Sequence, residues 1–168
     1  MTDLKSYITA IPDFPKPGIL FRDVMPLLRT QFGRTIAALD ALLDEPEWSG
    51  IDAVAGIEAR GFILGAALAA RRGKGFVAIR KQGKLQPPVT QVAYALEYGE
   101  AVLEMQPGTG RLLLVDDVMA TGGTLTAAAQ LCERSGYQLG AMATLLDLQL
   151  VANLRIGDIH LRTVLRYD

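Results

Sequence analysis

Two adjacent carboxylates, Asp116 and Asp117, close an apolar run of three leucines and a valine. They are followed at once by "MATGGT" (residues 119–124), which places two threonines around a glycine pair, and then by an alanine-rich segment. An acid, a threonine and a glycine can form an ordinary capped turn between a strand and a helix. That interpretation accounts for one acid and one glycine, but it leaves the rest of the group unexplained.

A bound phosphate explains more of this pattern. The backbone amides after Met119 would converge at a helix N-terminus, where the helix dipole favours anions. Each charge-assisted hydrogen bond contributes roughly 1.5–3 kcal/mol net, so a few amides and hydroxyls can hold a phosphate without a lysine. The predicted phosphate-binding residues are Ala120, Thr121, Gly122, Gly123 and Thr124.

The acid pair needs a different partner, because carboxylates repel phosphate. Asp116 and Asp117 suit the hydroxyl groups of a ribose, which are donors, and they would stabilise positive charge that develops on the sugar ring. A phosphate loop beside two carboxylates therefore predicts a site for a ribose 5-phosphate group. Two other common phosphate-binding motifs, GxxxxGK followed by serine or threonine and GxGxxG after a strand, do not occur in the sequence.

Strand and helix patterns alternate through the middle of the chain and predict an α/β fold. Right-handed crossovers then give a mainly parallel central sheet with helices on both faces. Ligands of such sheets lie beyond the carboxyl ends of the strands, and the loops after Ile57 and Val115 both fall there. The expected strands are 52–57, 75–80, 111–116, 139–148 and 159–167, with a hairpin of 90–96 and 101–106, helices at 32–43, 61–73 and 123–135, and an extended arm at 11–21.

Composition excludes several classes of protein. At 168 residues the chain fits one domain. Its net charge of −1 and pI near 5.8 argue against a general nucleic-acid binder, and no apolar run approaches the roughly 18 residues of a membrane span. A single cysteine (Cys132) excludes an internal disulfide and a cysteine metal cluster, and a single histidine (His160), in a strand-like segment, argues against a histidine-dependent triad and a two-histidine metal site. Without a secretory signal at the N-terminus, we expect a cytoplasmic protein.

The segment "VDDVMATGGT" (115–124) resembles the 5-phosphoribosyl-1-pyrophosphate (PRPP) motif of the type I phosphoribosyltransferases. Over nearly the whole chain, and in the same order, further segments resemble the adenine phosphoribosyltransferase family. These are "IPDFPKPGILFRD" (11–23), "GIEARGF" (56–62), "IRKQGKL" (79–85) and "YALEYGEAVLEMQ" (94–106).

The resemblance implies the type I phosphoribosyltransferase fold, with a small N-terminal hood at residues 1–30 and a flexible loop, hairpin and catalytic flap at 80–106. It implies transfer of the phosphoribosyl group from PRPP to adenine, giving AMP and pyrophosphate. Mg²⁺ is expected as a cofactor bound mainly through PRPP or pyrophosphate oxygens. A homodimer is also implied.

Pyrophosphate binding is expected from a set of residues that the resemblance identifies, with Arg60 gripping the leaving group through its planar guanidinium. It also implies a cis peptide between Glu58 and Ala59. Some of the basic charge could serve the neighbouring subunit, and a solvated loop is the plain alternative for the basic cluster. The expected pyrophosphate-binding residues are Glu58, Ala59, Arg60, Arg80, Lys81 and Lys84.

Proton transfer at the purine needs another group. Relatives that use 6-oxopurines carry an aspartate where this chain has Ala120, which cannot transfer a proton. The family resemblance indicates Glu97 as the catalytic acid or base, with Arg60, Asp116 and Asp117 as its catalytic companions, and it indicates Tyr98 as part of the flap. A solubilising acid at a hairpin tip is the alternative for Glu97.

Adenine recognition is assigned by resemblance to the N-terminal arm. Phe21 would stack near the base, the backbone of Leu20 to Arg22 would read its edge, and Leu148 would cover the other face. Phe21 and Leu148 could equally be ordinary core residues.

Two other functions stay open. One is a PRPP-sensing regulator that keeps the fold without catalysis, which the retained Glu97 and Arg60 disfavour. The other is an enzyme for orotate or xanthine; orotate would want a further cation in the base pocket, where only Arg22 is found. The chain also departs from relatives at Met25, where they carry threonine, and in its polar C-terminal segment, which leaves the dimer contact less defined.

Overall fold

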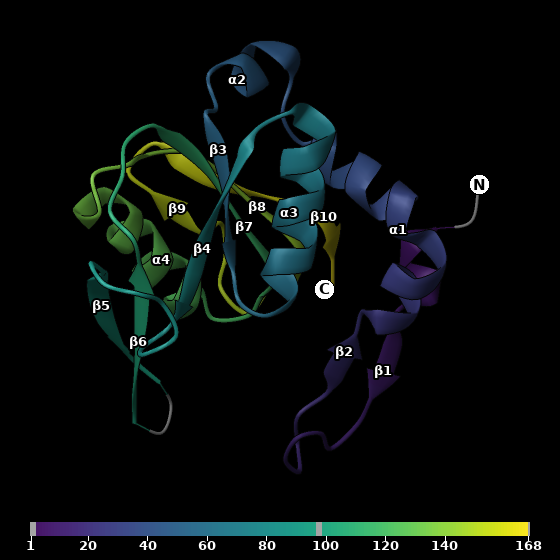
Figure 1. Ribbon diagram of the computed structural model, residues 1–168. Helices are drawn as coiled ribbons and strands as arrows, with labels where there is room; N and C mark the ends of the chain where they lie inside the picture. Colours follow the sequence, from purple (N-terminus) through teal and green to yellow (C-terminus); the bar gives the residue numbers. More distant parts are fainter. Residues whose placement is uncertain (1–2, 97–98, 168) are drawn as a thin grey trace. The chain divides into compact units, whose positions relative to one another are not determined.

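The computed structural model describes residues 3–96 and 99–167 (Figure 1). The chain divides into two compact units, Met1–Ala38 and Leu39–Asp168, which are described separately below. In the described residues, no helix is both long enough and apolar enough to cross a membrane.

The first unit contains a hairpin and most of a kinked helix. Strands β1 (Thr9–Ile11) and β2 (Phe21–Asp23) pair in antiparallel fashion, so that Ile11 lies opposite Phe21. The expected extended arm at 11–21 is therefore wrong in shape: its two ends meet, and residues 12–20 form the loop. Asp13, at a positive φ of 55°, turns this loop and accepts a hydrogen bond from the Gly18 amide at 2.7 Å.

The helical parts of this unit are short or bent. The 3₁₀ helix η1 (Leu4–Tyr7) precedes the hairpin, and helix α1 (Met25–Asp40) follows it, with a break in helical geometry at Gln31. Helix α1 begins seven residues before the predicted start at 32. A proline in the first turn has a φ that already fits the helix, and its missing N–H costs no helical hydrogen bond. The Asp23 carboxylate accepts a hydrogen bond from the Met25 amide at 2.9 Å.

The second unit is built on a sheet of eight described strands in the order β5-β6-β4-β3-β7-β8-β10-β9. Neighbouring strands from β4 to β10 run parallel, and antiparallel pairs occur only toward the edges, at β4–β6, β5–β6 and β10–β9. The strands are β3 (Ala53–Ile57), β4 (Gly75–Lys81), β5 (Thr90–Ala95), β6 (Glu100–Met105), β7 (Arg111–Met119), β8 (Gln138–Asp147), β9 (Arg155–Ile156) and β10 (Ile159–Arg166). The predicted α/β class with a mainly parallel sheet is confirmed.

Two helices connect parallel strands in opposite directions across this sheet. Helix α3 (Arg60–Arg72) joins β3 to β4, and helix α4 (Gly123–Arg134) joins β7 to β8, while β3 and β7 are themselves neighbours. Right-handed crossovers therefore place the two helices on opposite faces (Figure 1). The strand order reverses between β3 and β7, which is where ligands bind in sheets of this kind.

Apolar faces hold these helices to the sheet. Ala128, Leu131 and Cys132 of α4 are fully buried in one core cluster with strand residues such as Leu112 and Leu114. On α3, Leu64 and Leu68 are likewise fully buried, and the helix ends at Gly73, whose φ of 62° is the left-handed C-terminal conformation that glycine adopts easily. The predicted stop at Gly73 is confirmed.

One strand boundary and one short helix differ from the sequence prediction. Strand β7 continues to Met119 rather than ending at residue 116, and it stays in register with β8 as far as Asp147, so Asp117 lies on the strand together with Asp116. A short helix, α2 (Glu45–Ser49), was not predicted; its N-terminus is fixed by reciprocal hydrogen bonds between Asp44 and Glu47.

Candidate active site

A cavity of about 410 Å³ lies at the carboxyl ends of β3 and β7, where the strand order reverses. Three separate segments of the second unit converge on it: the β3–α3 connection, the end of β7 with the start of α4, and the hairpin side of the sheet. Its lining residues are Ile57, Glu58, Ala59, Arg60, Lys81, Tyr94, Leu103, Asp116, Asp117 and Thr124. The structure thus brings together the acid pair, Arg60 and Thr124, which is the last residue of the predicted phosphate loop.

The two acids of β7 are held against each other. Asp116 Oδ1 accepts a hydrogen bond from the Asp117 amide at 2.9 Å, and the Asp117 carboxylate forms an ion pair with Arg60. Asp117 Oδ2 is buried and accepts no aligned hydrogen bond, so Arg60 partners it by charge. Burial, and then the negative charge of Asp117, raise the pKa of Asp116 well above its usual range. Ionisation of both acids would therefore place two negative charges beside the single guanidinium of Arg60.

Helix α3 can bring Arg60 to the acids because the next residue is glycine. A Cβ on Gly61 would lie 3.0 Å from the Val115 carbonyl oxygen and 3.1 Å from Asp116 Oδ1. Both contacts are closer than a side chain ordinarily makes, so glycine permits the helix to start against β7. The peptide bond between Glu58 and Ala59, just before the helix, is cis, as the family resemblance implied.

The loop after β7 forms a second, smaller recess of about 90 Å³ that shares Asp116 and Thr124 with the main cavity. Gly122, at φ 85°, is the N-cap of α4, and it provides no side chain to cap the helix. The first amides of α4 therefore meet no capping side chain of their own, as an anion site requires. The recess is lined by Asp116, Val118, Met119, Ala120, Thr121, Gly122, Thr124 and Leu125.

The basic stretch at 80–84 is only partly at the cavity. Lys81 lines it, whereas Arg80 and Lys84 do not. Glu58 links the two regions: its Oε2 accepts from Arg80 Nη2 at 3.1 Å, and its Oε1 accepts from the Lys81 amide at 2.6 Å. Burial acts to raise the pKa of Glu58, but the Lys81 amide and the Arg80 guanidinium outweigh it and hold that pKa below the usual value.

The remaining predicted residues stay predictions. Glu97 and Tyr98 lie outside the described residues. Leu20, Phe21 and Arg22 belong to the first unit, where Phe21 packs edge-on against Phe14 with ring centroids 5.2 Å apart. Leu148 belongs to the second unit, half-buried just after β8, and its amide donates to the Met119 carbonyl at 3.0 Å.

The sequence prediction missed Tyr94. This residue of β5 lines the cavity, and its hydroxyl accepts a hydrogen bond from Thr124 Oγ1 at 3.4 Å. Alternation along 90–96 indicated only that Tyr94 shares a face with Val92; the position of that face relative to α4 depends on the twist of the hairpin.

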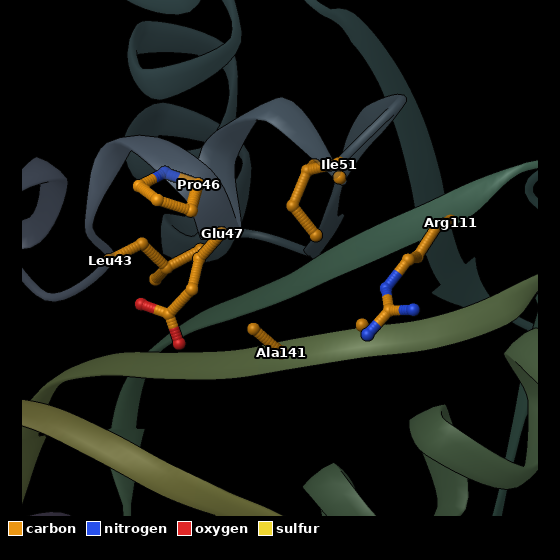
Figure 2. A pocket seen from close by; sticks show the side chains of 8 residues that line it. Leu43, Pro46, Glu47, Ile51, Arg111 and Ala141 are labelled. Atoms are coloured by element: carbon orange, nitrogen blue, oxygen red, sulfur yellow. The ribbon is translucent and has the colours of Figure 1, made fainter.

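A third hollow, of about 260 Å³, lies at the opposite ends of the strands. Figure 2 shows Glu47 and Arg111 reaching toward it from different sides, beneath Leu43, Pro46 and Ile51. Glu47 is already paired with Arg162, and no hydroxyl, thiol or imidazole is among the described residues that line the hollow. It therefore lacks the groups that the first cavity assembles.

Known proteins are similar to this chain in sequence and in fold. A family model described as "Phosphoribosyl transferase domain" matches residues 31–150. An adenine phosphoribosyltransferase of Bdellovibrio bacteriovorus is 47% identical over 98% of this chain and 99% of its own length, and one of Hydrogenovibrio crunogenus is 45% identical over 98% and 96%. The chain belongs to the adenine phosphoribosyltransferase family.

Solved structures agree with this membership. The adenine phosphoribosyltransferase of Thermoanaerobacter pseudethanolicus superposes with a TM-score of 0.89 at 37% identity, covering 98% of each chain. The Saccharomyces cerevisiae enzyme, solved with an imino-altritol bisphosphate and adenine, gives 0.88 at 34% identity over 96% of each chain. The protein is accordingly a transferase enzyme with the type I phosphoribosyltransferase fold.

Proposed function

We propose that this protein makes AMP in purine salvage by transferring the phosphoribosyl group of PRPP to adenine, with release of pyrophosphate. The observation that carries the proposal is the cavity in which Asp116, Asp117, Arg60 and Thr124 meet. This cavity combines an anion-binding helix start with carboxylates suited to a sugar, in a chain that belongs to the adenine phosphoribosyltransferase family.

Phosphate and sugar would occupy adjoining parts of this cavity. The 5-phosphate fits the recess formed by Ala120–Thr124, which offers backbone amides and two hydroxyls. The ribose hydroxyls would then lie against Asp116 and Asp117, whose negative charge would stabilise the cation-like sugar as its bond to pyrophosphate breaks. In this arrangement the raised pKa of Asp116 falls when donors or positive charge arrive.

The leaving group would be bound on the other side of the acids. Arg60 lies there with the Glu58–Ala59 segment and Lys81, all of which line the cavity. Arg60 is paired with Asp117, so pyrophosphate would compete with Asp117 for Arg60, and the sugar hydroxyls would compete with Arg60 for Asp117. We assign supporting roles to Arg80 and Lys84, which would add positive charge to this region or to the site of the neighbouring subunit in a homodimer.

We assign the base to Leu20, Phe21, Arg22 and Leu148, and the proton transfer at the purine to Glu97, with Tyr98 closing over the site. Adenine is the base that the names of the relatives indicate. The polar edge that recognises it would come from backbone groups of residues 20–22, which distinguish an amine from an oxo group.

Mg²⁺ fits this site as a companion of the substrate. No three acidic, histidine or cysteine side chains form a metal-binding group within the described residues, whereas Asp116 and Asp117 offer oxygen ligands of the kind Mg²⁺ prefers. The ion would be held mainly by PRPP or pyrophosphate oxygens, with these acids beside it. When bound, it would supply positive charge that neutralises the leaving pyrophosphate.

A panel of bases tests the proposal. Purified protein with Mg²⁺ and PRPP is expected to convert adenine to AMP and to leave hypoxanthine, guanine, xanthine and orotate unchanged, as measured by chromatography of the nucleotide products. Preference for another base would overturn the substrate assignment. Binding of PRPP without turnover of any base would instead identify a regulator.

A further inference from the structure

Glu104 of β6 is a buried carboxylate that no catalytic role explains. It is 1% exposed, and no ion pair with a lysine or arginine reaches it in the part of the chain that the structure describes. A carboxylate without a counter-cation is costly to bury unless hydrogen bonds satisfy its oxygens. The hydrogen-bond partners of Glu104 therefore indicate which segment of the chain this carboxylate holds in place.

Main-chain amides of the loop between β4 and β5 satisfy this carboxylate. Oε1 accepts from the Lys84 amide at 2.8 Å and from the Leu85 amide at 2.7 Å, while Oε2 accepts from Gln91 Nε2 at 3.1 Å. Gly83, at φ 82°, turns the chain just before these amides, and successive amides at such a turn form a concave anion site. The Leu85 amide is the largest of the causes that lower the pKa of Glu104.

A chain of hydrogen bonds connects this anchor to the cavity. The Lys84 carbonyl accepts from Arg80 Nη1 at 3.3 Å, and Arg80 also donates to Glu58, which lines the cavity. Glu58 in turn accepts from the Lys81 amide. Two acids thus fix the basic stretch 80–84 at both ends.

Both acids hold the lysines through main-chain amides rather than through ammonium groups. The side chains of Lys81 and Lys84 are exposed, and neither forms an ion pair among the described residues. The stretch is consequently rigid in its backbone while these two ammonium groups stay available, which suits the binding of a polyanion.

We propose that Glu104 is a positioning residue for pyrophosphate and for the pyrophosphate end of PRPP, acting by anchoring the basic stretch 80–84. This inference rests on the proposed function. A purely structural role for Glu104 would lower the stability or the active fraction of the enzyme, but it would leave the affinity of the folded enzyme for pyrophosphate unchanged.

Hydrogen exchange tests the anchor without reference to activity. In Glu104→Gln, which keeps the shape and one oxygen acceptor, exchange of the Lys84 and Leu85 amides is expected to accelerate by about tenfold, the factor that corresponds to about 1.4 kcal/mol. Glu133→Gln, the same change on the exposed surface of α4, is the matched control and should leave these amides unchanged. Unaltered exchange in Glu104→Gln would overturn the anchoring.

Kinetics test the consequence for binding. Glu104→Gln is expected to raise KM for PRPP and Kd for pyrophosphate by about tenfold, while kcat at saturation and KM for adenine change by less than about twofold. Removing Lys81 in the same background should then cost less than Lys81→Ala costs alone, because the two changes act on one binding unit. An unchanged KM for PRPP in Glu104→Gln would contradict the proposal, as would fully independent effects of Glu104→Gln and Lys81→Ala in the double variant.

If Glu104→Gln does not fold, Gln91→Ala weakens the same anchor while it keeps the carboxylate. A smaller shift of the same sign is expected, and no shift in either the exchange rates or pyrophosphate affinity would count against the proposal. Failure of the wild-type protein to bind pyrophosphate at all would instead refute the proposed function, and the exchange measurement would still decide whether Glu104 anchors the loop.

Discussion

Asp116 lies where the folded protein disfavours its ionised form. Burial and the neighbouring Asp117 raise its pKa, which means that the ionised form costs folding free energy at neutral pH. Replacing it with asparagine removes that cost and keeps an oxygen that can accept from the Asp117 amide. We therefore expect Asp116→Asn to increase the free energy of unfolding, by on the order of 1 kcal/mol, and to lower kcat by at least about tenfold.

Calorimetry and steady-state assays of AMP formation measure these two effects. The stabilisation should shrink as the pH falls through the raised pKa, and it should be lost below the ordinary value of 3.8, where Asp116 of the wild type is neutral in both the folded and the unfolded state. Asp158→Asn, at an exposed acid, is the control. A kcat within twofold of wild type would show that Asp116 does not stabilise the sugar.

Gly61 offers a test of the close approach between α3 and β7. In Gly61→Ala the new Cβ would press on the Val115 carbonyl and on Asp116, and a carbonyl inside a parallel sheet cannot move aside cheaply. A loss of about 1–3 kcal/mol in unfolding free energy is expected, together with reduced kcat. Gly33→Ala, in α1 with nothing within 4 Å of the new Cβ, should be neutral or stabilising by up to about 1 kcal/mol. Equal behaviour of the two variants would contradict this account.

The residue types in the sequence predicted the chemistry of the site better than they predicted which residues line it. The sequence indicated Asp116, Asp117 and the glycine loop because this combination is unusual at the end of an apolar strand. Tyr94 and Glu104 were not, because each occupies an ordinary alternating strand position and acquires its role from a hydrogen bond to a segment distant in sequence.

At the level of elements, the start of α4 is where the phosphate loop can be tested cleanly. A Cβ on Gly123 would meet nothing closer than 3.9 Å, so Gly123→Val should change the melting temperature little. Its side chain would nevertheless enter the space assigned to the 5-phosphate. Affinity for PRPP, measured by calorimetric titration, is expected to fall by at least about tenfold, which is roughly one strong charge-assisted hydrogen bond. Unchanged affinity would show that the amides do not converge there.

Elements with strong periodicity were predicted well. Helix α3 with its Gly73 stop, the β5–β6 hairpin and the strands of the parallel sheet follow the expected pattern closely. Short elements such as α2 and β9 carry too few residues for a period to show. The end of β7 was misplaced because aspartate is uncommon in strands, and pairing with β8 overrides that local preference.

At the scale of the whole molecule, the sequence predicted one domain with an N-terminal hood at residues 1–30, and this stays a prediction. The structure describes the chain as two compact units, Met1–Ala38 and Leu39–Asp168. Local patterns indicate elements but not which contacts between elements are dense enough to form one unit.

The second unit depends on acids paired with guanidinium groups at several places, which predicts its behaviour in acid. Glu47 is the clearest case: hydrogen bonds first from Arg162 and then from the Asp44 amide lower its pKa to about 2, against 4.5 for the free side chain, and this pair connects α2 to β10. Asp40, paired with Arg72, and Glu58, paired with Arg80, also have lowered pKa values.

A carboxyl whose folded pKa is depressed stabilises the protein above its unfolded pKa and loses that contribution as the pH falls through the folded value. We therefore expect the contribution of these ion pairs to be nearly constant above pH 4.5 and the melting temperature to drop steadily from there toward pH 2, the two values that bracket Glu47. Glu47→Gln should reduce this dependence slightly, by no more than about 1 kcal/mol at neutral pH, because the pair is partly exposed to solvent. A melting temperature that rises continuously from pH 4.5 to pH 2 would mean that relief of the Asp116 charge outweighs these ion pairs.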